Sequence, residues 1–210
     1  MLRTPLNILL YSQTSGGKTT LALDLINRPE LFDKRIDEIT YVYSMYNPRF
    51  KLFPHVKFIK QEIPELKADG KTKILVCDDL LINKAAMDKL ITIFLVSAHH
   101  SNTTVIINVQ QLTGDKRLRT LSINTHVFFL FSHLRDTLSI KTLFSQTGLS
   151  TDFLKKAYKL ATKKKYSYLG LDLQSCTSES LRVFSNVLDA HPSYFLDREI
   201  ETPYAVSFDE

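Results

Sequence analysis

The chain has 210 residues, of which 44% are apolar and 23% charged, a composition typical of a globular protein that buries one core. No apolar run is long enough to cross a bilayer, and residues 1–5 lead directly into a predicted strand, so we expect neither a membrane protein nor a signal peptide. Cys77 and Cys176 suggest no disulfide framework or zinc site, and we expect a reducing, intracellular compartment. The net charge of +5 is weak support for an acidic partner.

The first predicted elements are a buried strand at residues 6–11 and a helix that includes residues 21–26. Small and polar residues connect them: Ser12, Gln13, Thr14, Ser15, Gly16, Gly17, Lys18, Thr19 and Thr20. This order predicts a phosphate-binding loop, because backbone N–H groups of the loop and of the helix start converge on one anion. We expect Lys18 to contact the β- and γ-phosphates and the Thr19 hydroxyl to bind Mg2+.

The loop departs from the usual pattern at one position. That pattern is a glycine, four residues, and Gly-Lys-Ser/Thr, so Ser12 occupies the place of the first glycine. That glycine normally relieves a tight turn, although Gly16 adds freedom nearby. The alternative, a Ser/Gly-rich surface turn, does not explain Lys-Thr at the start of an apolar helix, so we interpret the loop as a nucleotide site.

The remaining elements follow in chain order. Apolar and β-branched runs predict strands at residues 38–44, 56–59, 73–80, 103–109 and 125–131. Helical spacing and capping predict helices at residues 84–97, 135–143 and 151–161. Residues 166–173 and 181–184 predict a closing hairpin. We therefore predict one domain over residues 1–187 and an acidic tail over residues 188–210.

The strand at residues 73–80 carries a pair of acids, Asp78 and Asp79, after four apolar residues. A Mg2+ ion beside a nucleotide needs a carboxylate at the carboxyl end of such a strand, as in a Walker B motif. We expect Asp78 to hold the metal through water, and Asp79 to orient or deprotonate the attacking water. A solvated acidic turn is the alternative, and the preceding phosphate-binding loop favours the metal site.

The strand at residues 103–109 is followed by Gln110. A side-chain amide at this edge of the sheet reaches the γ-phosphate and its water, and it senses the phosphate without changing its protonation state. We interpret Gln110 as this sensor. A hydrogen bond that merely ends the strand is the alternative.

Charge is distributed unevenly along the chain. Between Thr113 and Tyr166, eleven lysines and arginines stand against three acids, whereas after Val187 six acids stand against one arginine. Residues 155–165 contain six lysines and no acid. We interpret this segment as a contact for DNA phosphates, with a solvated helix face as the alternative.

Several segments together resemble one family of P-loop proteins. A phosphate-binding loop, a Walker B strand with a second acid and a strand ending in glutamine indicate ATPases with an extra strand between the two motifs. Residues 99–102, running into residues 105–110, resemble the FtsK–HerA superfamily. One branch of this superfamily packages viral genomes and occurs in Polinton/Maverick elements, adintoviruses and related large DNA viruses. The segments of this chain that resemble that branch are residues 119–126, 134–136, 166–169 with Asp172, and 181–182. The resemblance covers residues 6–187.

The resemblance implies an α/β P-loop NTPase fold, with a mainly parallel central sheet and helices on both faces. The strand at residues 103–109 would lie between those at residues 6–11 and 73–80. The implied activity is an ATP- and Mg2+-dependent motor that pumps double-stranded DNA into a capsid. Its partners would be double-stranded DNA, further copies in a ring (commonly a hexamer) and the capsid or portal vertex, with no membrane. Its location would be the host nucleus, a cytoplasmic viral assembly site, or the virion.

The resemblance also assigns catalytic roles by position, to Lys18, Asp79, Gln110 and Arg119. Arg119 would be an arginine finger that reaches the γ-phosphate of the neighbouring subunit, with Arg117 and Arg135 as alternatives. Two residues depart from the superfamily. Ser12 replaces a glycine, and Asp79 stands where a glutamate, one methylene longer, is usual. Both departures concern the rate of hydrolysis more than nucleotide binding.

Two other functions remain open from the sequence. A nucleotide or nucleoside kinase is also a small P-loop protein, but we find no arginine-rich lid or acceptor motif. A GTPase is disfavoured because residues 83–86 lack the aspartate that reads guanine. A nucleotide-binding DNA-binding subunit without turnover is the second alternative, and Ser12 is the feature that suggests it.

Overall fold

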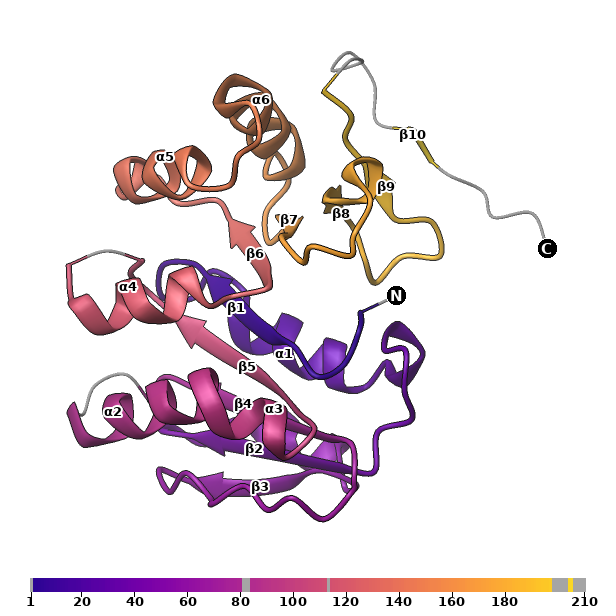
Figure 1. Cartoon of the computed structure of the whole chain (residues 1–210). Helices are drawn as coiled ribbons and strands as arrows, with labels where there is room; N and C mark the ends of the chain where they lie inside the picture. Colours follow the sequence, from indigo (N-terminus) through magenta and orange to yellow (C-terminus); the bar gives the residue numbers. More distant parts are fainter. Residues whose placement is uncertain (1, 81–83, 113, 198–203, 206–210) are drawn as a thin grey trace.

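The strands of the described residues form one ten-stranded sheet in the order β10-β9-β8-β7-β6-β1-β5-β4-β2-β3 (Figure 1). The structure is a computed structural model, and it describes residues 2–80, 84–112, 114–197 and 204–205. The strands are β1 (Asn7–Tyr11), β2 (Glu38–Tyr43), β3 (Lys57–Lys60), β4 (Lys73–Asp78), β5 (Thr103–Val109), β6 (Val127–Phe131), β7 (Tyr168–Asp172), β8 (Val183–Ser185), β9 (Ser193–Tyr194) and β10 (Tyr204–Ala205). None of the helices in the described ranges is long and apolar enough to cross a membrane.

The sheet has a parallel part and an antiparallel part. All pairings from β6 through β1, β5, β4 and β2 to β3 are parallel. The strands from β7 to β10 extend the sheet beyond β6 in antiparallel fashion, and the predicted hairpin is their β7–β8 pair. β5 lies between β1 and β4, so the predicted insertion of a strand between the two motif strands is confirmed.

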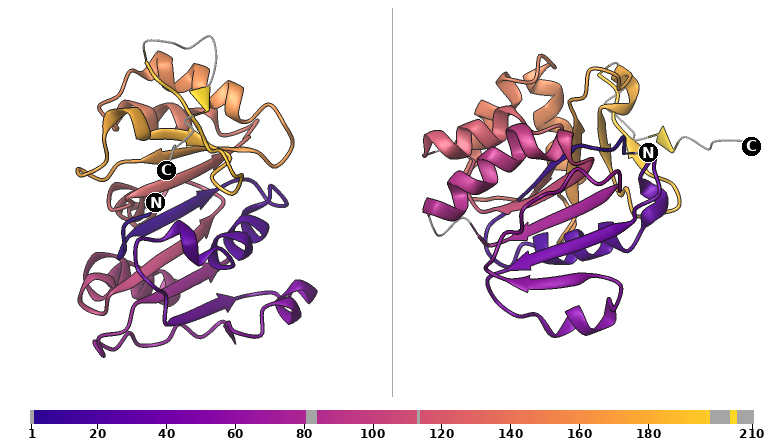
Figure 2. Two further views of the ribbon diagram at one scale, coloured as in Figure 1. Left: turned by 90° about the vertical axis from the view of Figure 1, so that its right-hand side faces the viewer. Right: turned by 60° about the horizontal axis from the view of Figure 1, so that its bottom comes forward.

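Helices cover both faces of the sheet, as predicted (Figure 2). They are α1 (Lys18–Ile26), α2 (Lys84–Thr92), α3 (Ala98–His100), α4 (Lys116–Ile123), α5 (Thr137–Ser145) and α6 (Thr151–Ala161). Successive side chains of a strand point to opposite faces, so each central strand feeds two cores. In β1, Leu9 belongs to the core under α2 to α6, whereas Ile8 and Leu10 belong to the core under α1.

Three segments differ from the sequence interpretation or add to it. The helix predicted at residues 84–97 changes at Ile93–Ser97 into a π-helical turn before α3. The sequence interpretation does not include helix α4, which begins where the Asp115 side chain accepts a hydrogen bond from the Arg117 N–H at 2.7 Å. Within the expected tail, β9 and β10 join the sheet edge, and the domain boundary at residue 187 stays a prediction.

Candidate nucleotide-binding site

The loop between β1 and α1 has the backbone that an anion site needs. Ser15 (φ 61°) and Gly17 (φ 106°) are left-handed, and the Gly16 N–H donates to the Gln13 carbonyl at 3.1 Å. Gly17 is the N-cap of α1 and has no side chain to cap the first N–H groups of the helix. These donors therefore remain for an anion at the positive end of the helix dipole.

Ser12 is accommodated in the loop because the residue that faces it is a glycine. The Ser12 side chain is fully buried, and its hydroxyl donates to the Gln13 carbonyl at 3.0 Å. A Cβ on Gly16 would lie 1.5 Å from Ser12 Oγ and 2.8 Å from Ser12 Cβ. The missing glycine of the motif is thus offset by a second glycine four residues later, and the loop keeps a tight turn.

Lys18 lies against the loop that precedes it. Its ammonium donates to the carbonyls of Ser12 at 2.7 Å and Gln13 at 3.0 Å, and the residue is 6% exposed. Burial lowers the pKa of Lys18, while the nearby carboxylates of Asp79 and Asp78 act in the opposite direction. A phosphate group at this position would supply the negative charge that a buried ammonium needs.

The Asp78 carboxylate receives hydrogen bonds from three elements. Thr19 Oγ1 at the start of α1 donates to Oδ2 at 2.8 Å, and Tyr41 of β2 donates to the same oxygen at 2.7 Å. Asn108 Nδ2 of β5 donates to Oδ1 at 2.5 Å. Burial, followed by the charge of Asp78, raises the pKa of Tyr41, so its hydroxyl stays a donor. The sequence interpretation missed Tyr41 and Asn108, because polar atoms inside apolar strands look like core residues.

The oxygen atoms of Thr19 and Asp78 could serve as ligands of a magnesium ion that is also bound by phosphate. Thr19 and Asp78 bring a hydroxyl and a carboxylate together, which are the oxygen ligands that Mg2+ takes. Among the described residues, no cluster of three or more His, Cys, Asp or Glu side chains could hold a metal by itself. A metal here would therefore need phosphate oxygens and water to complete its shell.

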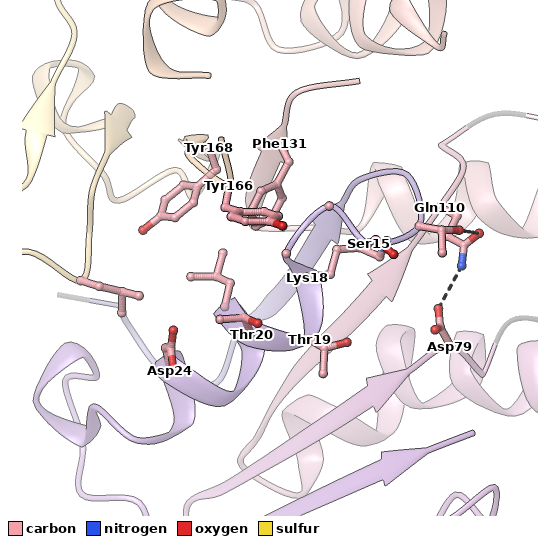
Figure 3. A pocket seen from close by; sticks show the side chains of 15 residues that line it. Ser15, Lys18, Thr19, Thr20, Asp24, Asp79, Gln110, Phe131, Tyr166 and Tyr168 are labelled. Atoms are coloured by element: carbon pink, nitrogen blue, oxygen red, sulfur yellow. Dashed lines mark hydrogen bonds between the residues drawn. The ribbon is translucent and has the colours of Figure 1, made fainter. Parts of the chain in front are cut away.

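Gln110 connects the phosphate-binding loop to the second acid of the Walker B pair. Its Nε2 donates to Asp79 Oδ1 at 3.2 Å, and its Oε1 accepts from Thr14 Oγ1 at 3.2 Å (Figure 3). Asp79 has a φ of 54°, a left-handed conformation in which Asp and Asn are enriched. The structure thus brings together Thr14, Asp79 and Gln110, which the sequence placed in one site from three separate segments.

A cavity of about 580 Å3 holds these groups at one end and aromatic side chains at the other. Lys18 and Thr19 line it beside Asp79 and Gln110, whereas its apolar end consists of Phe131, Tyr166, Tyr168 and Leu188 (Figure 3). A second cavity of about 410 Å3 is also lined by Asp79 and Gln110, together with Asn108. Asp79 and Gln110 therefore contact both cavities, which gives solvent a route to the acid.

The three candidate fingers differ in their partners, and none of the three lines the larger cavity. The guanidinium of Arg117 pairs with Asp88 at 2.5 Å and with Asp115 at 3.5 Å. Arg119 on α4 and Arg135 are exposed, and neither has an acidic partner within the part of the chain that the structure describes. The side chain of Arg117 therefore has acidic partners within the same chain.

Asn83, which bears on guanine recognition, lies outside the described residues.

The sheet order and the loop together define a P-loop NTPase fold of the α/β class. Solved structures similar to this chain include the genome packaging NTPase B204 from Sulfolobus turreted icosahedral virus 2, in complexes with ATP-gammaS, sulfate and AMPPCP. The TM-scores are 0.51, 0.52 and 0.54 at 14%, 15% and 16% identity, over 82% of this chain and 94% of B204. No family model and no curated protein matches the chain.

The fit between Ser12 and Gly16 predicts compensation between the two positions. Gly16→Ala should destabilise the protein by about 1–3 kcal/mol, because the added methyl overpacks a buried loop. Adding Ser12→Gly removes the two closest atoms, leaves the Gln13 carbonyl oxygen at 3.0 Å from the added Cβ, and should restore part of that stability. Thermal unfolding of the wild type, both single variants and the double variant measures the coupling. Strictly additive effects would mean that the two side chains do not share this space.

Proposed function

We propose that the chain is the ATPase subunit of a ring-shaped motor that packages double-stranded viral or transposon DNA into a capsid. The observation that carries the proposal is the Gln110 amide, which bridges Thr14 of the phosphate-binding loop and Asp79 beside the Thr19–Asp78 pair. The fold that the chain shares with B204, a genome packaging NTPase, supports the proposal. The finer assignment to the Polinton/Maverick and adintovirus branch rests on the sequence segments that resemble it.

Each residue has a distinct task in the proposed hydrolysis. Lys18 and backbone N–H groups of residues 13–20, apart from the paired N–H of Gly16, would hold the phosphates of ATP, and Thr19 and Asp78 would hold the Mg2+ ion. The ion, when bound, neutralises charge that develops on the phosphate oxygens. Asp79 accepts a proton from the attacking water. That water would reach Asp79 through the second cavity, which Asp79 also lines. Gln110 orients that water through its amide and exchanges its Thr14 contact for the γ-phosphate.

Phosphate release separates the proposed motor from the other two functions. A translocase should release phosphate faster when double-stranded DNA is present. A kinase should need a small acceptor instead, and a degenerate subunit should show no turnover. The tight packing of Ser12 on Gly16 supports an intact loop, which is the opposite of what a degenerate subunit requires.

Substitution of Lys18 and Asp79 should separate binding from turnover. Lys18→Ala should abolish or nearly abolish ATP binding, because it removes the cation that lies in the loop. Asp79→Asn should bind ATP normally and lose about 10²–10⁴-fold in rate, because an amide cannot act as a base. Asn also tolerates the left-handed backbone and can still accept from Gln110, so the variant isolates basicity. Calorimetry and phosphate release measure the two effects, and normal hydrolysis by Asp79→Asn would move the base elsewhere.

Arg119 is proposed as the finger because it is exposed and without an acidic partner among the described residues. Arg119→Ala should bind ATP but lose at least about a thousandfold in hydrolysis within the assembled ring. Mixing it with Lys18→Ala should recover activity, because each variant supplies at some interfaces what the other lacks. Arg117→Ala is the matched control, since the ion pairs of Arg117 within its subunit predict retained hydrolysis. Assembled mixtures without recovered activity would indicate a role in cis.

Three of the six lysines in the segment proposed to hold DNA lie on α6, and the other three lie in the turn that follows it. Lys155 on the helix pairs with Asp152 at 2.9 Å, whereas Lys163, Lys164 and Lys165 are exposed and have no acidic partner in the described ranges. A grip on DNA without sequence preference acts through phosphates, so counterion release should dominate binding.

Replacement of Lys163, Lys164 and Lys165 by Ala should weaken binding equally for unrelated DNA sequences. The log–log slope of affinity against salt should flatten by roughly two to three, because each phosphate that the protein neutralises adds about 0.9 to its steepness. Basal ATP hydrolysis should persist. A matched control removes the same charge at the other end of the sheet, through Lys51, Lys57 and Lys60 to Ala, which are also exposed. If only the control flattens the slope, DNA follows the β3 side.

A further inference from the structure

We infer that the aromatic end of the larger cavity binds the purine base of the nucleotide, with Tyr166 as the ring on which the base stacks. The inference rests on the proposed nucleotide binding and adds a site for the part of the ligand that the phosphate-binding loop does not reach. The cavity extends from Lys18 and Gln110 to Phe131, Tyr166 and Tyr168, so one continuous space joins the phosphate-binding loop to the aromatic side chains (Figure 3).

The first observation is the backbone of Tyr166. The residue has a φ of 65°, which is left-handed and unfavourable for a bulky side chain. It lies in a turn between α6 and β7, closed by the Ser167 N–H, which donates to the Lys164 carbonyl at 3.2 Å. Glycine or asparagine would adopt this conformation at less cost. A strained residue at the mouth of a cavity is a sign of function when its side chain can contact a ligand there.

The second observation is the position of the Tyr166 ring. Tyr166 is 57% exposed, so burial in the core does not account for an aromatic side chain at this position. A Cβ added to Gly17 would lie 3.4 Å from Tyr166 Cδ1 and 3.2 Å from Phe131 Cε1. The ring thus lies beside the N-cap of α1, next to the residues that would hold the phosphates, and on the side away from Gln110 and Asp79 (Figure 3).

The rest of the cavity wall suits a flat aromatic ligand. The Val187 N–H donates a hydrogen bond to the Tyr168 hydroxyl at 3.1 Å and so holds the Tyr168 ring in place. Leu188, the residue after Val187, also lines the cavity. On the opposite wall, Thr20 and Asp24 are bound by the guanidinium of Arg49 at 3.2 and 3.3 Å. Because Thr20 and Asp24 already have a hydrogen-bond partner, we expect the base to contact mainly the aromatic side chains. Stacking on these rings would then be the main contribution to the binding of the base.

The competing explanation is a contact within the turn itself. The Lys165 ammonium lies 4.8 Å from the centre of the Tyr166 ring. An exposed cation–π contact is weak, and the lysine is on a flexible stem, so a base can displace it at little cost. The contact also does not require a left-handed residue at 166, since a lysine and an aromatic ring can meet in many turns.

The test compares ATP with inorganic tripolyphosphate, which carries the phosphates but no base. Calorimetry with Mg2+ should give tighter binding of ATP than of tripolyphosphate to the wild type. Tyr166→Asn keeps a residue that accepts the left-handed backbone, and it should lower ATP affinity about tenfold with tripolyphosphate affinity unchanged. Tyr166→Phe should bind both ligands like the wild type. Tyr46→Ala is the matched control, because Tyr46 is 55% exposed and its ring contacts Tyr43 and Phe50 instead.

Each other outcome rejects the inference in a distinguishable way. If Tyr166→Asn binds ATP as well as the wild type does, or loses affinity for both ligands equally, the base does not stack on this ring. A decrease in ATP affinity in Tyr46→Ala as large as that in Tyr166→Asn would also reject a specific subsite. If the wild type binds neither ligand, the proposed nucleotide binding fails, and the base subsite fails with it.

Discussion

The Asp78 carboxylate is the group on which the architecture of the site depends. It ends β4, and it accepts hydrogen bonds from the start of α1, from β2 and from β5. Because these hydrogen bonds are largely buried, removing one would leave a desolvated charge or hydroxyl without its partner, which is costly. One carboxylate therefore fixes the position of the phosphate-binding loop relative to three strands, and it holds the Thr19 hydroxyl where the proposed Mg2+ would need a ligand.

The two residues that depart from the pattern of the superfamily that the sequence resembles are both matched by local structure. Ser12 fits because Gly16 leaves room for its side chain. Asp79 occupies a left-handed position that a short polar side chain accepts more readily than a longer one. A carboxylate one methylene shorter can still contact Gln110 from this backbone. Both substitutions are therefore compatible with a working site, because each is accompanied by the geometry that it needs.

One turn brings together two proposed contacts that a motor would have to couple. The segment proposed to hold DNA ends in the lysines at residues 163–165, and the tyrosine proposed to stack on the base is the next residue. Because Tyr166 has a left-handed backbone, the position of its ring depends on the conformation of the whole turn. A base that binds or leaves would therefore act on the backbone that carries the lysines, which would link the proposed base contact to the proposed DNA contact.

The sequence by itself determined the parallel sheet and the positions of Lys18, Asp78 and Gln110, because carboxyl ends of parallel strands share one edge and motif spacing identifies them. The place of β5 within the sheet followed from the resemblance of these motifs to P-loop ATPases with an extra strand. The tertiary structure alone decided the remainder. Asn108 is one residue of a uniformly buried strand, so only the neighbouring strands show that it supports Asp78. Tyr166 precedes β7, which runs antiparallel to β6, so the beginning of β7 reaches the nucleotide edge. Strand direction depends on pairing between distant segments, and no local pattern of residues encodes it.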